Sequence, residues 1–393
     1  MSRREAKAAY APKKSPKRRR RKIPKWLRPP GHDRVYAIMS GSARDPRAHL
    51  MRAATSLVSP AFRAAVFSRN TLHNVGVIGG RDLGRPTISV GNLTTGGTGK
   101  TPIVIALAHR LQAMGHRPAV LLRGYEPAGF ESKKGSDEAA VLRGALGEDV
   151  PVMPDRKRTR GAAAVLEKHP EVTVFLLDDG FQHRAAKRDL NLVLIDATRP
   201  FGFGRLLPRG LMREPIGALR RADAVILTRV NRVEPARLTE IAQRIEKVTG
   251  RPPLAHAQHD WTTLRLAYKS YPLDRLRRFT ALGVAGIGNP ADFEQRLRQL
   301  AGGCVGCLIF DDHFLYERSD LSGIFNTALE RGADAVVTTE KDWVKWRRSA
   351  HGVKIKIPVF RPVVEMKFVR GEEALDALLQ QTFDQLPAPD NEA

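Results

Sequence analysis

Cysteine is scarce in this sequence, which has only Cys304 and Cys307 among its 393 residues. Two cysteines build no disulfide framework, and their scarcity is typical of a protein from a reducing compartment. A zinc site is disfavoured too, because a single C-x-x-C pair needs a second pair or suitably spaced histidines. Both cysteines fall in an apolar run over residues 304–310 that predicts a strand. We expect them to pack in the core on opposite faces, since residues three apart on a strand point to opposite sides.

Long hydrophobic runs are missing as well. No stretch of about eighteen apolar residues occurs, so we expect no membrane-spanning helix. The basic N-terminal segment has no apolar run behind it, which argues against a secretory signal peptide. Apolar residues make up 42% and charged residues 27% of the chain, as in a soluble globular protein that is long enough for two domains.

Acidic residues are outnumbered, 41 against 66 Lys and Arg, which gives a formal net charge of +25. Residues 1–34 alone hold fourteen Lys and Arg against two acidic residues. We expect residues 1–40 to be a basic, disordered extension suited to phospholipid headgroups or nucleic acid. A tail that only aids solubility, or an extension from a misassigned start, is the alternative. No known nucleic-acid-binding module follows, so nucleic acid is not expected as a partner.

A glycine-rich stretch follows the β-branched run over residues 86–90. Strand, glycine-rich turn, Gly-Lys-Thr and helix-patterned segment together predict a phosphate-binding loop. Its residues are Thr94, Thr95, Gly96, Gly97, Thr98, Gly99, Lys100 and Thr101. Backbone N–H groups and the helix N-terminus favour bound phosphate. Lys100 is expected to reach the β- and γ-phosphates, and Thr101 to offer its hydroxyl to Mg²⁺.

The rest of the chain alternates short apolar runs with helical patterns. This alternation predicts an α/β fold, a doubly wound and mostly parallel sheet around the phosphate loop, with ligands at the carboxyl ends of the strands. A polar, proline-containing break near 252–277 separates a second, smaller α/β unit. We expect a phosphate-loop domain over residues 41–270, a smaller domain over 271–385 and a frayed tail over 386–393.

An amphipathic pattern covers residues 47–69. It predicts an N-terminal amphipathic helix, interrupted at Pro60, with arginines between its apolar residues. Such a basic helix lies on a membrane surface or packs against its own domain, and the segment alone favours neither.

Carboxylates stand where phosphoryl transfer needs them. Asp178 and Asp179 end a continuous apolar run over 172–177, which predicts a Mg²⁺ site. Gln182 and His183 follow as candidates to orient substrate, although a lone histidine is as often an ordinary core or surface residue. Asp137 opens a helix-patterned segment, where acidic residues also occur simply because they suit the helix dipole. The functional alternative is that Asp137 accepts a proton from a hydroxyl nucleophile.

Three further polar strings follow apolar runs or loops: Arg213-Glu214-Pro215, Asp311-Asp312-His313 and residues 338–342. Their place at strand ends predicts a cleft between the two domains.

Together these strings resemble one family, tetraacyldisaccharide 4'-kinase, the lipid A 4'-kinase of Gram-negative bacteria. The resemblance covers about residues 50–380 and excludes the basic N-terminal segment. The strings that carry it are I-S-V-G-N-L-T at 88–94 and on through Pro102, R-G-Y at 123–125, S-D-E at 136–138, D-D-G-F-Q-H at 178–183, L-L-P at 206–208, R-E-P at 213–215, A-G-I-G-N-P at 285–290, D-H at 312–313 and T-T-E-K-D at 338–342.

The resemblance implies transfer of the ATP γ-phosphate to the 4'-hydroxyl of a tetraacylated glucosamine disaccharide 1-phosphate. It implies a peripheral enzyme at the cytoplasmic face of the bacterial inner membrane that uses ATP and Mg²⁺. By position, Asp137 corresponds to the catalytic base and His313 to its partner. The Mg²⁺ and phosphate network corresponds to Thr101, Glu138, Asp178 and Asp179, beside Lys100. Residues that line the substrate cleft correspond to Gln182, His183, Arg213 and Glu214.

The sequence departs from the family in two places. Ala139 follows Asp137-Glu138 where the family usually has proline. Arg209 stands in a loop that the family often spells L-P-A-G-P-L-R-E-P, and we expect its charge to suit the substrate 1-phosphate. A nucleic-acid-dependent ATPase and a GTPase are competing interpretations, but residues 228–231 (T-R-V-N) match a guanine-reading loop poorly.

Overall fold

The structure is a computed structural model that describes residues 31–124, 137–288, 290–312, 314–349, 352–353 and 355–385. Residues 1–30 of the predicted disordered extension 1–40, the predicted helix cap Ser136, the predicted partner His313 and the predicted tail 386–393 lie outside the described residues. The prediction of disorder is wrong for residues 31–40, which form a helix.

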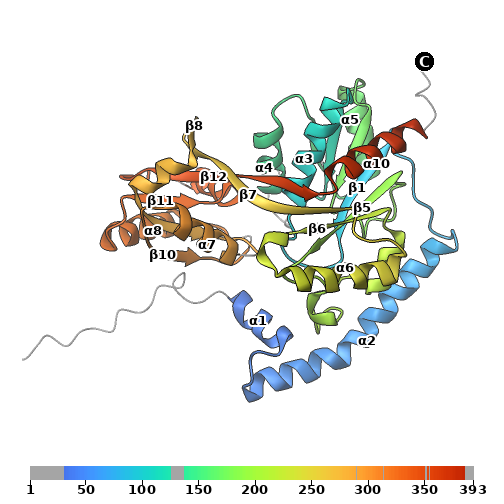
Figure 1. The fold of residues 1–393 in the computed structure, drawn as a ribbon, viewed down its shortest axis with the longest axis horizontal. Coiled ribbons are helices and arrows are strands. Elements are labelled where there is room, and N and C mark those ends of the chain that lie inside the picture. Colours follow the sequence, from blue (N-terminus) through green and yellow to red (C-terminus); the bar gives the residue numbers. More distant parts are fainter. Residues whose placement is uncertain are drawn as a thin grey trace, which may run out of the picture.

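One continuous sheet runs through the described chain, in the order β10-β9-β11-β12-β7-β6-β5-β1-β4-β2-β3, with β8 paired to β7 (Figure 1). Its strands are β1 (Thr87–Asn92), β2 (Pro118–Leu122), β3 (Val152–Pro154), β4 (Val174–Asp178), β5 (Leu190–Asp196), β6 (Ala224–Thr228), β7 (Ala255–Leu266), β8 (Lys269–Pro272), β9 (Thr280–Ala285), β10 (Gly303–Ile309), β11 (Ala335–Thr338) and β12 (Val359–Arg370). All pairs are parallel except β7 with β8 and β7 with β12. The expected doubly wound, mostly parallel α/β sheet is confirmed.

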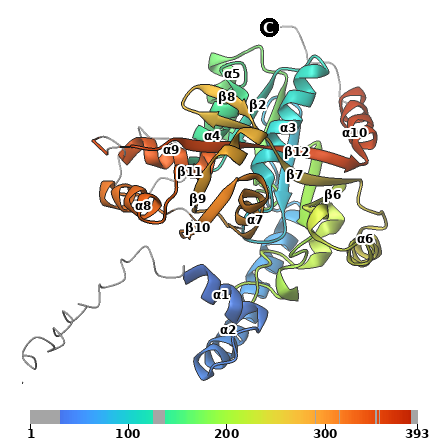
Figure 2. The same ribbon diagram turned by 60° about the vertical axis from the view of Figure 1, so that its left-hand side comes forward.

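The helices lie on both faces of the sheet and at its ends. They are α1 (Gly31–Ser40), α2 (Pro46–Asn74), α3 (Lys100–Ala113), α4 (Asp137–Leu146), α5 (Arg158–Lys168), α6 (Pro235–Thr249), α7 (Pro290–Leu300), α8 (Arg318–Glu330), α9 (Glu340–Ser349) and α10 (Glu372–Asp384). Figures 1 and 2 both place α1 and α2 at the bottom of the molecule and α5 at the top.

The antiparallel pair β7 and β12 joins the two halves of the sheet. The sequence prediction missed both strands, because β7 lies in the stretch taken as a polar break. Strand β7 has both buried and partly exposed residues, so its sequence lacks the continuous apolar run that marks the central strands. After β12 the chain returns to the first half, where Leu375 and Leu379 of α10 join the same core as Leu107 of α3. The division near residue 270 stays a prediction, but the sheet itself runs across it.

The two cysteines do not follow the strand geometry expected for them. The register of β10 against β9 shifts between Cys304 and Cys307, and Gly306 between them adopts φ +123°. This bulge brings both side chains against one apolar cluster instead of opposite faces. Burial raises the pKa of the Cys307 thiol to about 12, and the neighbouring Cys304 adds to the effect. Core packing therefore accounts for the pair.

Helix α2 is longer than expected and continues through Pro60. The predicted interruption is wrong. Proline removes one backbone donor, but Pro60 and Ser56, four residues earlier, are both exposed, so water can satisfy the released carbonyl. Ala48 and Val66 are buried, whereas Leu50 and Leu57 are 71% and 83% exposed.

A buried carboxylate anchors α2 to the sheet. Glu214 has no solvent-exposed surface, and its oxygens accept hydrogen bonds from Asn70 (2.9 Å), Arg221 (2.8 Å) and Arg69 (3.3 Å). The sequence prediction placed Glu214 in the substrate cleft. The structure corrects this, because the carboxylate is enclosed by partners from α2 and from residues 216–221.

A close approach explains the glycine of the V-G-N-L string. A Cβ at Gly91 would collide with the Cβ of Phe181 and lie 2.6 Å from its backbone nitrogen. Residue 91 can therefore carry no side chain while D-D-G-F-Q-H packs against β1.

We predict that Gly91→Ala lowers the free energy of unfolding by about 2–3 kcal/mol, because β1 and the Phe181 turn must separate. Urea denaturation measures this. Gly144→Ala in α4 is the matched control, since a Cβ there meets nothing within 4 Å, and it should be neutral or slightly stabilising. Equal stabilities of the two variants would contradict the packing argument.

We predict that Glu214→Ala costs about 3–5 kcal/mol of stability, because it leaves Arg69 and Arg221 without their buried counter-charge. Faster proteolysis within residues 46–74 should accompany the loss, since α2 is released. Glu330→Ala is the control, because Glu330 is exposed on α8. Unchanged proteolysis of α2 in Glu214→Ala would show that this carboxylate does not anchor the helix.

Candidate active site

The phosphate loop connects β1 to α3. Gly99 caps α3 with φ +87°, a conformation that favours glycine, and Lys100 begins the helix. Asn92, the last residue of β1, donates hydrogen bonds to the Thr94 carbonyl (2.8 Å) and the Thr98 hydroxyl (2.9 Å). The Lys100 ammonium in turn donates to the Asn92 amide oxygen (3.3 Å). The sequence assigned no role to Asn92, although the residue belongs to the V-G-N-L string.

The adjacent strand β4 carries the two aspartates to the same edge of the sheet. Asp179 follows β4 with φ +56°. Its carboxylate lies 3.3 Å from the Lys100 ammonium and accepts two hydrogen bonds from Arg213, at 2.8 and 3.0 Å. Burial opposes its ionisation, but Lys100 and Arg213 overcome this and lower its pKa to about 2. Asp179 is therefore a carboxylate at neutral pH.

Asp178 differs sharply from its neighbour. It is buried at the end of β4, and burial raises its pKa to about 7, opposed by Lys100 and reinforced by Glu138 and Asp179. Its Oδ1 atom is buried and has no hydrogen-bond partner within the described residues. A buried acceptor of this kind, with two further carboxylates close enough to influence it, suits a hard divalent cation.

No group of three metal-binding side chains forms in the part of the chain that the structure describes. Mg²⁺ usually takes one or two carboxylates and fills its shell with phosphate oxygens and water. Asp178 and Thr101, the second residue of α3, carry the kinds of oxygen atom that such an ion takes. The structure thus brings Lys100, Thr101, Asp178 and Asp179 to one edge of the sheet.

Gln182 and Arg213 extend this cluster. Gln182 donates to the Asn92 carbonyl (2.8 Å) and accepts from Arg213 (3.4 Å). His183 lies close by and is half-buried. Burial, together with Arg158 and Arg188, lowers its pKa to about 4, so its imidazole is neutral at physiological pH.

Asp137 lies at the N-terminus of α4 and contacts the other half of the molecule. Its Oδ1 accepts a hydrogen bond from Arg348 of α9 at 2.8 Å. On the same half, Asp312 accepts from Lys341 at 2.8 Å, one residue before His313. The structure thus places Asp137 opposite α9, and it describes no contact of His313.

The last residue of the T-T-E-K-D string, Asp342, stabilises a loop. Asp342 is fully buried and accepts hydrogen bonds from the Gly286 N–H (2.8 Å), the Tyr316 hydroxyl (3.1 Å) and the Thr339 hydroxyl (2.6 Å). It therefore fixes the loop after β9, which includes Gly288. A Cβ at Gly288 would lie 3.0 Å from the Gly97 nitrogen, so this loop closely approaches the phosphate loop.

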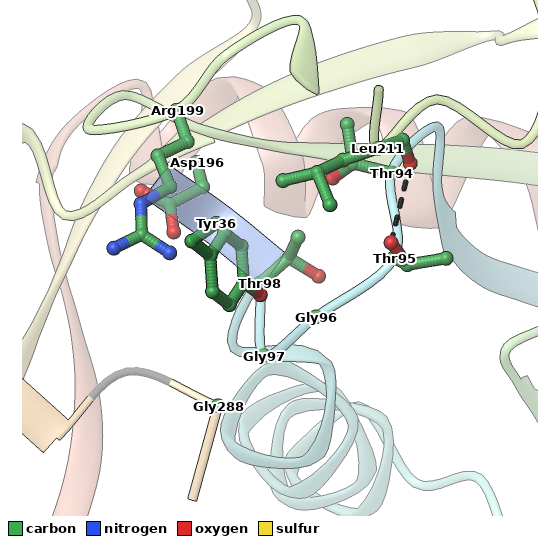
Figure 3. Close-up of a pocket in the computed structure, with 10 residues that line it drawn as sticks. All are labelled: Tyr36, Thr94, Thr95, Gly96, Gly97, Thr98, Asp196, Arg199, Leu211 and Gly288. Atoms are coloured by element: carbon green, nitrogen blue, oxygen red, sulfur yellow. Dashed lines mark hydrogen bonds between the residues drawn. The ribbon is translucent and has the colours of Figure 1, made fainter. Parts of the chain in front are cut away.

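A pocket opens beside the phosphate loop (Figure 3). Residues 94–98 form one wall, and Asp196, the last residue of β5, forms another with Arg199, which follows the strand. Tyr36 of α1 and Gly288 complete the lining from two other parts of the chain. The Thr228 hydroxyl donates to the Thr98 carbonyl (3.0 Å) and holds the loop from the side of β6.

Comparison with known proteins identifies the chain's relatives. The family model described as tetraacyldisaccharide-1-P 4'-kinase matches residues 51–384. A tetraacyldisaccharide 4'-kinase of Geobacter sulfurreducens is 37% identical over 361 residues, which cover 87% of this chain and 98% of the relative. That of Anaeromyxobacter sp. (strain K) is 35% identical over 358 residues, which cover 88% and 94%.

A solved structure agrees. LpxK from Aquifex aeolicus, crystallised in complex with ATP, is 30% identical and superposes with a TM-score of 0.63 over 85% of this chain and 99% of that chain. The motifs, the fold and both kinds of relative point to the same conclusion. The chain belongs to the tetraacyldisaccharide-1-P 4'-kinase family.

Proposed function

We propose that loop 94–101 binds ATP and that the surrounding cleft carries out the family's reaction with the residues described above. The chain is an ATP-dependent kinase of lipid A biosynthesis, and its acceptor is a tetraacylated disaccharide 1-phosphate. The observation that carries the assignment of the site is the contact of Lys100 with Asp179, which in turn binds Arg213. This arrangement puts two cations, Lys100 and Arg213, and the ionised carboxylate of Asp179 beside the phosphate loop.

The transferred phosphoryl group needs positive charge around it, because charge spreads over its oxygens in the transition state. Loop N–H groups, the Lys100 ammonium and the Arg213 guanidinium supply that charge from fixed positions. Thr101 and Asp178 would hold a Mg²⁺ ion, which would neutralise further phosphate charge. Asp179 orients the Lys100 ammonium and the Arg213 guanidinium, and Glu138 acts on Asp178 through its charge.

Asp137 is the proposed general base. Its carboxylate accepts the proton of the 4'-hydroxyl, the oxygen attacks the γ-phosphorus, and ADP leaves with the electrons of the broken phosphoryl bond. Arg348 of the opposite half donates a hydrogen bond to this carboxylate at 2.8 Å, so the proposed base lies where the two halves meet. His313 is the proposed partner of Asp137, by the family resemblance.

The acylated acceptor resides in a membrane, so the enzyme must reach the bilayer surface. No described helix is both long enough and apolar enough to cross a membrane. Helix α2 offers another means, because Leu50 and Leu57, two turns apart on one side, face solvent, and Arg47, three residues before Leu50, is exposed on the same side. We propose peripheral attachment through α2 at the cytoplasmic face of the inner membrane.

The activity is tested with purified protein, Mg-ATP and the acylated disaccharide 1-phosphate in detergent, with the product identified by its mass. Asp137→Asn should lower kcat by about 10²–10⁴-fold, because the amide cannot accept the proton but keeps an oxygen for Arg348. ATP binding and the circular dichroism spectrum should remain unchanged. A variant with near-normal kcat would remove Asp137 from the role of base.

The membrane proposal is tested by flotation with vesicles that contain anionic phospholipid. Leu50→Ser with Leu57→Ser should reduce the bound fraction by at least about tenfold, because two exposed leucines no longer enter the bilayer. Tyr268→Ser with Val369→Ser is the matched control, since both residues are exposed away from α2. If both double variants bind alike, α2 is not the attachment site.

A further inference from the structure

Helix α1 precedes the part of the chain that the family model matches, which begins at residue 51. In the structure it nevertheless reaches the phosphate loop, and Tyr36 lines the pocket there (Figure 3). The protein therefore carries an element outside the matched region at the edge of its proposed nucleotide site.

Arginines from two other elements hold α1 in place. Arg209 donates a hydrogen bond to the carbonyl of Met39, the residue before the last of α1, at 2.8 Å. Arg52 of α2 donates to the carbonyls of Ala43 (2.6 Å) and Ile38 (3.4 Å). Arg209 is the residue that departs from the family's usual loop spelling. In this protein the arginine at 209 serves to hold α1 in place. The same loop carries Arg213.

Contacts with the ring of Tyr36 hold its side chain in place, and its hydroxyl points toward the phosphate loop. The Arg199 guanidinium carbon lies 4.6 Å from the ring centroid, and Phe203 meets the ring edge-on at 6.5 Å. The hydroxyl lies beside Gly96, so that a Cβ at residue 96 would come within 3.2 Å of the hydroxyl oxygen. Gly96 also has φ +108°, a backbone conformation that glycine adopts readily and residues with a side chain rarely do.

We propose that Tyr36 is a nucleotide-contact residue of this enzyme, with its hydroxyl donating a hydrogen bond to a phosphate oxygen of ATP bound on loop 94–101. This rests on the proposed function. The pocket chemistry supports it, because one wall is the phosphate loop itself and the Arg199 guanidinium over the ring brings a positive charge, while the Asp196 carboxylate in the lining is paired with Arg229. An anionic ligand is favoured where a cation and a hydroxyl donor meet backbone N–H groups.

The alternatives make different predictions. A tyrosine that contacts the lipid acceptor would change only the KM for the acceptor. A tyrosine that occludes the loop would weaken nucleotide binding, so that its removal would tighten it.

Tyr36→Phe tests the proposal in the full-length protein, since it keeps the ring contacts with Arg199 and Phe203 and removes only the hydroxyl. We expect the Kd for ATP, measured by calorimetry, and the KM for ATP to rise by about tenfold, the effect of one hydrogen bond to a charged group. The KM for the acceptor and kcat should stay unchanged. Tyr268→Phe is the control, because Tyr268 is fully exposed, and it should match the wild type.

An unchanged or lower Kd for ATP in Tyr36→Phe, or a change confined to the KM for the acceptor, would overturn the proposal. The proposed function is tested separately by Lys100→Ala. If the wild-type protein neither binds ATP nor phosphorylates the acceptor, the proposed function fails. If it does both, loses them in Lys100→Ala and keeps its Kd in Tyr36→Phe, only the role of Tyr36 fails.

Discussion

The ionised carboxylate of Asp179 is the interaction on which the site depends. It binds the phosphate-loop lysine on one side and Arg213 on the other, and so joins the ends of β1 and β4 to the loop that precedes residues 216–221. Its low pKa follows from these two cations, which outweigh its burial. Next to it, Asp178 is buried with an unpartnered oxygen. One carboxylate thus organises the cations, and its neighbour supplies the unsatisfied acceptor that a metal ion needs.

The second half of the molecule completes the site. Arg348 reaches Asp137, and the loop fixed by Asp342 approaches the phosphate loop at Gly97. The two halves are joined through β7 and β12, so the positions of Asp137 and the phosphate loop relative to the second half depend on the same sheet that links them. This is consistent with a kinase that must bring a nucleotide and a second substrate together between two surfaces.

The sequence was sufficient for features with local signals. The phosphate loop, the aspartates after β4 and the alternation of strands and helices all follow from short-range patterns. Glu214 was misplaced because its partners Arg69 and Asn70 lie about 145 residues away, where no local pattern indicates them. The strand β7 was missed because half-exposed linking strands lack a continuous apolar run, and the bulge at Gly306 depends on a register that only pairing with β9 sets.

The return of the chain after β12 has a consequence for biosynthesis. Leu375 and Leu379 are fully buried in the core beneath the phosphate-loop half, and Asp376 binds Arg110 of α3 at 2.6 Å. A ribosome must therefore have added residues as far along the chain as Leu379 before this core can close. The phosphate-loop half is synthesised first, but its core is completed only when α10 packs on it. Until then the apolar surface that α10 covers is exposed and must be protected from aggregation.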